Sequence, residues 1–163
     1  MNAADPRPVV DARDGGALAR LRDGLPRPLV FTNGVFDVLH AGHVDCLVRA
    51  RGEGAALVVG VNGDACARRL GKGPGRPLNN EVDRARVVSA LAPVTAVVVF
   101  DEDVPLELVR ALRPDVYVKG GDYDAASLPE SALVASWGGR TVIVERTRGL
   151  SSSGLVKRLV AAR

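Results

Sequence analysis

The chain contains two histidines, His40 and His43, which lie three residues apart with Gly42 between them. Residues at this spacing share one face of a helix, so at the mouth of a helix both imidazoles point the same way. Gly34 and Gly42 let the backbone approach a ligand closely, and Gly42 leaves a helix N-terminus open to an anion. The pattern therefore predicts paired side chains beside a phosphate group.

Two other interpretations of the histidines remain open. In one, one histidine has a purely structural role, the other is exposed to solvent, and the glycines form turns. In the other, the pair binds a metal ion, although no Cys, Glu or Asp stands at a familiar ligand spacing around it.

A second candidate site lies near the C-terminus, where Arg146 precedes Ser151, Ser152 and Ser153. Serines at the beginning of a helix offer hydroxyls together with backbone N–H groups that have no partner within the helix. This combination favours a phosphate site. The simpler interpretation is capping of the helix by one serine.

Two glycine-rich segments follow predicted strands. Residues 70–77 (LGKGPGRP) form a loop with two cations, a pattern that mostly marks a surface turn, and residues 119–123 (KGGDY) form the other segment. The chain has no GxxxxGK[ST] sequence and no GxGxxG after a strand. A phosphate cradle must therefore be built in a different way.

Five apolar segments rich in valine alternate with helix-like stretches. The segments are nearly continuous in apolar character, which is typical of strands covered on both faces. They lie at 28–32, 56–62, 96–100, 115–119 and 140–145. Helices are expected around Val44, Leu47 and Val48, ending near Gly52 and Gly54, and at 80–91, with Asn80 as the cap. Further helices are expected at 105–112, at 128–137 and from Ser151. This alternation predicts an α/β fold: a Rossmann-like, doubly wound parallel sheet of five strands, with ligands at the carboxyl ends of the strands.

The length of the chain predicts one domain of ordinary size over residues 16–163, after a loose leader at residues 1–15. The net charge is +3, and the basic residues form no stripe with aromatic neighbours, which argues against a nucleic-acid partner. Cys46 and Cys66 fit no CxxC pattern and are expected to be reduced. The longest apolar run, 55–61, is too short to span a bilayer, so we expect a cytoplasmic protein without a membrane partner.

The motifs also carry a family resemblance. GVFDVLHAGH (34–43) and RTRGLSSS (146–153) resemble the HxGH and RTxGxST-like signatures of the cytidylyltransferase-like nucleotidyltransferases. Within that superfamily, residues 31–159 resemble the bacterial D-glycero-β-D-manno-heptose 1-phosphate adenylyltransferases, through FTNGxFDxLHAGH, VNxDA, the KGP–RP loop and VKGGDY. Val35 stands where relatives often have Cys, and the serine run is SSS rather than STT.

The resemblance implies transfer of AMP from ATP to heptose 1-phosphate, with release of pyrophosphate and formation of ADP-heptose for the lipopolysaccharide core. It implies Mg²⁺ on the triphosphate, no metal site built from protein side chains, and a homodimer. Cytidylyl transfer from CTP to glycerol 3-phosphate or a related small phosphate is the alternative within the superfamily. A non-catalytic nucleotide-binding module is the alternative outside enzymes.

Residue roles also follow from the resemblance. The implied catalytic residues are His40, His43 and Lys72. The implied nucleotide-binding residues are Thr32, Asn33, Gly34, Phe36, Gly42, Arg84, Lys119, Gly120, Arg146, Ser151, Ser152 and Ser153, with Arg84 as a phosphate clamp. The implied substrate-binding residues are Asp37, Asp64 and Asp122. Asp37 is expected either to orient a histidine or to anchor its loop.

Overall fold

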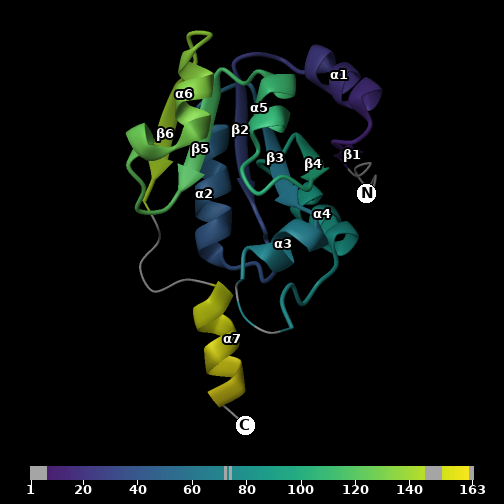
Figure 1. Cartoon of the computed structure of the whole chain (residues 1–163), viewed down its shortest axis with the longest axis vertical. Coiled ribbons are helices and arrows are strands. Elements are labelled where there is room, and N and C mark those ends of the chain that lie inside the picture. The colour runs from purple at the N-terminus through teal and green to yellow at the C-terminus, as the bar shows by residue number, and fades with distance from the viewer. Residues whose placement is uncertain (1–6, 72, 74, 146–151, 162–163) are drawn as a thin grey trace.

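A computed structural model of the chain describes residues 7–71, 73, 75–145 and 152–161. Its described strands form one parallel sheet in the order β1-β4-β3-β2-β5-β6 (Figure 1). The strands are β1 (Val9–Asp11), β2 (Leu29–Gly34), β3 (Ala56–Asn62), β4 (Ala96–Phe100), β5 (Val116–Gly120) and β6 (Arg140–Val144). The predicted α/β class, the parallel pairing and the Rossmann-like arrangement are confirmed.

The sheet has six strands rather than the predicted five, because residues 9–11 of the expected leader form the edge strand β1. Val9 to Asp11 pair in parallel with Val97 to Val99 of β4. Arg7 secures this edge by donating from Nη1 to the Leu91 carbonyl at 2.8 Å. The described part of the N-terminal segment is thus an ordered component of the sheet.

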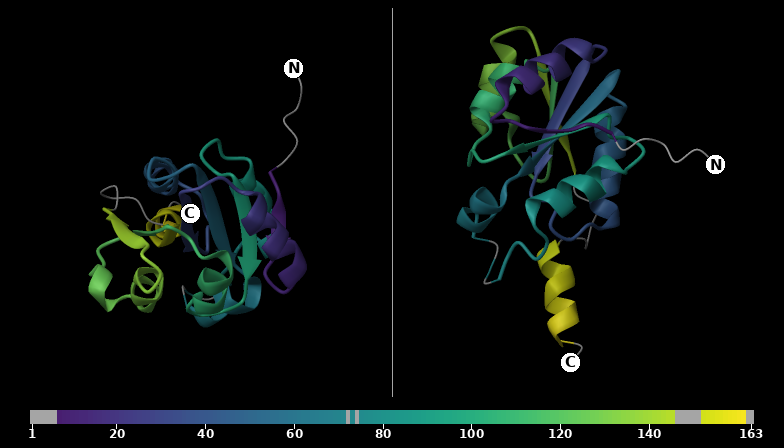
Figure 2. Two further views of the ribbon diagram at one scale, coloured as in Figure 1. Left: turned by 90° about the horizontal axis from the view of Figure 1, so that it is seen from above. Right: turned by 90° about the vertical axis from the view of Figure 1, so that its right-hand side faces the viewer.

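Helices cover both faces of the sheet, as the two turned views show (Figure 2). The helical elements are α1 (Gly15–Gly24), α2 (Ala41–Arg51), α3 (Asp64–Arg69), α4 (Glu81–Ser89), α5 (Leu106–Leu112), the 3₁₀ turn η1 (Ala125–Ser127), α6 (Pro129–Ala135) and α7 (Ser152–Ala161). Asn80 caps α4 as the sequence predicted, since its side chain accepts from the backbone N–H of Asp83 at 2.9 Å. Helices α1 and α3 were not predicted.

Two apolar layers explain the continuous hydrophobic segments. In β3, Leu57 and Val59 pack with α2 and α4 on one face, whereas Ala56 and Val58 pack with α1, α5 and α6 on the other. Successive side chains of a strand point to opposite faces, so a strand covered on both sides needs apolar residues at every position. All seven residues of β3 are buried.

The order of the strands reverses between β2 and β5. After β2 the chain moves outward through β3 to β4 and then returns to β5 on the other side of β2. In open parallel sheets such a switch point leaves a crevice at the carboxyl ends of the strands. Helix α7, in yellow, extends beyond this end of the sheet (Figure 1). Among the described helices, none has the length and apolar character needed to cross a membrane.

Candidate active site

A pocket of about 520 Å³ lies at the switch point. Six predicted residues from the end of β2 and the turn after it line this pocket: Thr32, Asn33, Gly34, Phe36, Asp37 and His40. Six more line it from α2, β5 and α7: Gly42, His43, Lys119, Gly120, Ser152 and Ser153. The topology therefore brings three distant motifs to one cavity.

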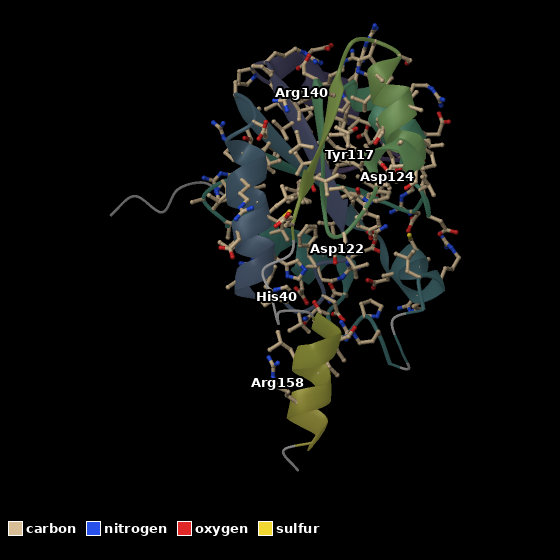
Figure 3. All side chains as sticks on the ribbon, turned by 90° about the vertical axis from the view of Figure 1, so that its left-hand side faces the viewer. His40, Tyr117, Asp122, Asp124, Arg140 and Arg158 are labelled. Carbon is tan, nitrogen blue, oxygen red and sulfur yellow. The ribbon has the colours of Figure 1, made fainter. Side chains whose placement is uncertain are left out.

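The remaining predicted residues divide into two groups. Arg84, Asp64 and Asp122 do not line the pocket. Asp122 is exposed, and Figure 3 places it on the segment after β5, whereas its neighbour Tyr123 does line the cavity. Lys72, Arg146 and Ser151 lie outside the described residues.

The two histidines stack on each other where α2 begins, near the lower end of the sheet in Figure 3, where His40 is labelled. Their ring centroids are 3.9 Å apart with an interplanar angle of 25°, so the predicted common orientation is confirmed. Burial lowers the pKa of His40, which favours the neutral imidazole. Its Nδ1 is buried without a hydrogen-bond partner in the described part of the chain. A neutral imidazole in a pocket can donate a hydrogen bond to a phosphoryl oxygen.

Phe36 holds the histidine loop in a strained conformation. Its φ is 50°, a left-handed value that is uncommon outside glycine, and its ring lies 5.3 Å from that of His43. The ring also covers Gly34, where a Cβ atom would come within 3.1 Å of Phe36 Cε2. Gly34 therefore makes room for the aromatic ring that supports the histidine. Strain of this kind concentrates at functional sites.

Asp37 anchors the loop at 76–79, which is one of the two roles expected for it. Its carboxylate accepts from Arg76 Nε and from the backbone N–H groups of Leu78 and Asn79, at 2.7 and 3.0 Å. The Asp37 side chain is 2% exposed, and among the described residues it forms no hydrogen bond or ion pair with either histidine. The structure thus shows a loop-anchoring contact for Asp37, and its substrate-binding role stays a prediction.

Arg84, predicted as a phosphate clamp, and Asp64, predicted beside the acceptor, pair with each other outside the pocket lining. Arg84 is 2% exposed and donates to Asp64 Oδ1 at 2.7 Å and to the carbonyls of Val35, Asn62 and Asn79 at 2.6, 2.7 and 2.9 Å. A guanidinium that is used in this way has little capacity left for a ligand. The arginine instead ties the histidine loop to the end of β3 and to the loop before α4.

Lys119 belongs to a polar network that sequence reasoning did not identify. Its Nζ donates to Asn33 Oδ1 at 3.3 Å and to the Tyr117 hydroxyl at 3.0 Å. The Tyr117 hydroxyl also lies 3.0 Å from Glu130 Oε1, and Glu130 is 3% exposed. Burial lowers the pKa of Lys119, and the nearby Glu130 carboxylate opposes that shift. The alternation of strand side chains was an available signal, because Tyr117 and Lys119 must share one face of β5.

The start of α7 contacts the histidine loop directly. Ser152 Oγ donates to the Val38 carbonyl at 3.0 Å, and Ser153 also lines the pocket. The first backbone N–H groups of a helix have no partner inside it and favour an anion. The predicted phosphate-binding helix end therefore lies at the same cavity as the histidines.

The described residues of the pocket do not form a cage for a metal ion. Three carboxylates line it, and two of them, Asp37 and Asp103, are paired with Arg76 and Arg69. A divalent ion at this site would need most of its ligands from elsewhere, as Mg²⁺ commonly obtains from phosphate and water.

The fold and the site define a nucleotidyltransferase of the HxGH type. Residues 31–160 match the family model described as cytidylyltransferase-like, and the chain belongs to this family. It is 62% identical over 120 residues to the D-beta-D-heptose 1-phosphate adenylyltransferase of Bordetella bronchiseptica, covering 74% of each chain. It is 53% identical to the bifunctional protein HldE of Streptomyces coelicolor, covering 91% of this chain but only 32% of that relative.

Solved structures agree with this placement. The lipopolysaccharide core biosynthesis protein of Thermoplasma volcanium is 30% identical with a TM-score of 0.61, over 73% of this chain and 95% of that one. A pantoate-beta-alanine ligase from Francisella tularensis is 14% identical with a TM-score of 0.64, over 93% of this chain and 73% of that one, and it shows similarity of fold alone.

Proposed function

We propose that this protein transfers the adenylyl group of ATP to D-glycero-β-D-manno-heptose 1-phosphate, giving ADP-heptose and pyrophosphate. The observation that carries the proposal is the stacked histidine pair at the switch-point pocket, in a chain 62% identical to an adenylyltransferase of this kind. The product would supply activated heptose for the lipopolysaccharide core.

The proposed reaction does not need a general base. A phosphate monoester has its second pKa at about 6, so at pH 7 the sugar phosphate is already an ionised nucleophile. One of its oxygens forms a bond to the α-phosphorus of ATP while the bond from that phosphorus to the bridging oxygen breaks and pyrophosphate leaves. The protein must align the two phosphates and stabilise the charge that builds up on the α-phosphoryl oxygens.

The described residues are suited to these tasks. His40 and His43 are proposed to donate to the phosphoryl oxygens, and the first turn of α7 with Ser152 and Ser153 to hold the outer phosphates. Lys119 and Asn33 form a polar wall for a hydroxyl-rich acceptor. Lys72 is proposed as a further point charge on the sequence pattern alone. Mg²⁺ is proposed to accompany the triphosphate, and none of these residue roles depends on it.

The assembly and the location are also proposals. We propose a cytoplasmic homodimer, in keeping with the family resemblance, and light scattering on the purified protein would test its mass in solution.

Pyrophosphate release tests the activity directly. Purified protein with Mg²⁺ is offered ATP or CTP, each with heptose 1-phosphate or glycerol 3-phosphate, and the product is identified by mass. We expect ADP-heptose from ATP and the heptose phosphate, and turnover with CTP at least roughly tenfold lower, which is about 1.4 kcal/mol of discrimination. Release only with CTP and glycerol 3-phosphate would overturn the substrate assignment while leaving nucleotidyl transfer in place. Release with none of the four pairs would leave the non-catalytic nucleotide-binding module as the better account.

A further inference from the structure

Arg76, for which no separate role was predicted, lines the pocket. Its side chain is 6% exposed and forms an ion pair through Nε with Asp37 Oδ2. Its Nη2 is buried and, within the described ranges, has no hydrogen-bond partner. Nε of this guanidinium thus binds Asp37, while Nη2 has no acceptor among the described residues.

The other hydrogen bonds of Asp37 explain why only part of the Arg76 guanidinium has a partner. A guanidinium and a carboxylate commonly pair through two parallel hydrogen bonds. Here the second carboxylate oxygen, Oδ1, already accepts the backbone N–H groups of Leu78 and Asn79. A buried charged donor without an acceptor is costly and uncommon in native proteins. An acceptor from outside the chain accounts for Nη2.

Other groups at the same turn point to the nature of that acceptor. Arg76 is held by Asp37, and Ser152 at the start of α7 donates to the carbonyl of the next residue, Val38. His40 Nδ1, in the same pocket, is also buried without a partner among the described residues. Two nitrogens without an acceptor in the described chain, one from the loop at 76–79 and one from the histidine loop, therefore lie in the same pocket, which Ser152 and Ser153 at the start of α7 also line. A ligand with several anionic oxygens fits such a set, as a polyphosphate does.

We propose that Arg76 Nη2 binds a phosphoryl oxygen of the nucleotide triphosphate, and that Asp37 is a positioning residue that fixes the guanidinium for this contact. The inference rests on the proposed function for the identity of the nucleotide. It gives Arg76 the phosphate-binding role that the sequence assigned to Arg84.

Arg76→Lys isolates the contact. Lysine keeps the positive charge and can meet Asp37 with its single nitrogen, but it has no second nitrogen for the ligand. We expect its affinity for Mg-ATP and for tripolyphosphate to fall about tenfold or more, the effect of losing one hydrogen bond to a charged group. Tripolyphosphate has no base and no sugar, so a parallel loss places the contact on the phosphoryl groups. Both affinities are measured by titration calorimetry without an acceptor.

Arg27→Lys is the matched control. Arg27 also pairs with an aspartate, since its Nη1 donates to Asp115 Oδ2 at 2.9 Å, but it lies before the amino end of β2 and outside the pocket. This variant should bind both ligands like the wild type. Circular dichroism checks the fold of each variant, and Arg76→Gln, which keeps an amide donor for Asp37, serves if Arg76→Lys does not fold.

Two results would overturn the inference. One is a folded Arg76 variant that binds tripolyphosphate as tightly as the wild type, which would leave Arg76 as a loop anchor alone. The other is a wild-type protein that does not bind tripolyphosphate. The proposed function fails separately, through the transfer assay, because these titrations require no turnover and no heptose phosphate.

Discussion

Replacement of Arg84 by methionine should destabilise the fold far more than it weakens ligand binding. The Arg84 side chain is 1% exposed and makes four hydrogen bonds, to Asp64 Oδ1 and to the carbonyls of Val35, Asn62 and Asn79. Methionine is similar in length and fills the space, so the change mainly removes the charge and the donors.

The size of the loss follows from these contacts. Removing one partner of a buried ion pair costs about 3–5 kcal/mol, because the other charge is left without compensation. Asp64 is 22% exposed, so water can relieve part of its loss, whereas the carbonyls of Val35 and Asn62 accept from Arg84 in buried hydrogen bonds. We therefore expect the free energy of unfolding to fall by about 4 kcal/mol out of a typical 5–15 kcal/mol. For a domain of this size that lowers Tm by roughly 8–16 °C.

Urea unfolding followed by the fluorescence of Trp137 measures this change, and calorimetric titration of Mg-ATP at low temperature measures the effect on binding. Asp64→Asn serves as the partner variant, and the double variant should lose less than the sum of the two single losses because the residues contact each other. If Arg84→Met unfolded like the wild type but bound nucleotide tenfold more weakly, Arg84 would be a ligand contact and our reasoning would be wrong.

Three further predictions concern the pocket. His43→Ala should fold normally but lower kcat by about 10²-fold, the scale of losing one preorganised donor; wild-type turnover would exclude His43 from the chemistry. Because burial lowers the pKa of His40, the unfolded chain binds the proton more readily, and stability should fall as the pH drops below about 6.5. His40→Gln should reduce the difference between urea midpoints at pH 7.5 and 5.5, and an unchanged difference would contradict this. Glu130→Gln removes the carboxylate that opposes the lowering of the Lys119 pKa. The alkaline limb of the pH profile of kcat/KM should therefore move to lower pH. Glu53→Gln, which changes a residue outside the pocket, should leave this limb where it is in the wild type.

Features that depend on local interactions could be predicted from the sequence of this protein. Strands buried on both faces require continuous apolar residues, so the segments that form β2 to β6 and their parallel arrangement could be predicted. The spacing of His40 and His43 predicted their common orientation, because the N-cap residue and a residue of the first turn of the same helix are placed together by local geometry. Asn80 was recognisable as a cap for the same reason. Edge strand β1 escaped prediction because its three residues acquire their conformation from pairing with β4.

The tertiary structure alone decided which charged residues face the pocket. Arg84 lies one helical turn before the buried Val88, so its side chain points into the core from α4. There its N–H groups donate to backbone carbonyls and to Asp64. Arg76 lies in a loop with no periodic pattern, and only its pairing with Asp37, 39 residues away, directs the guanidinium to the cavity wall. Residue type and local spacing define what a side chain can do. Its partners depend on contacts between distant segments, which form only when the sheet brings its carboxyl ends together.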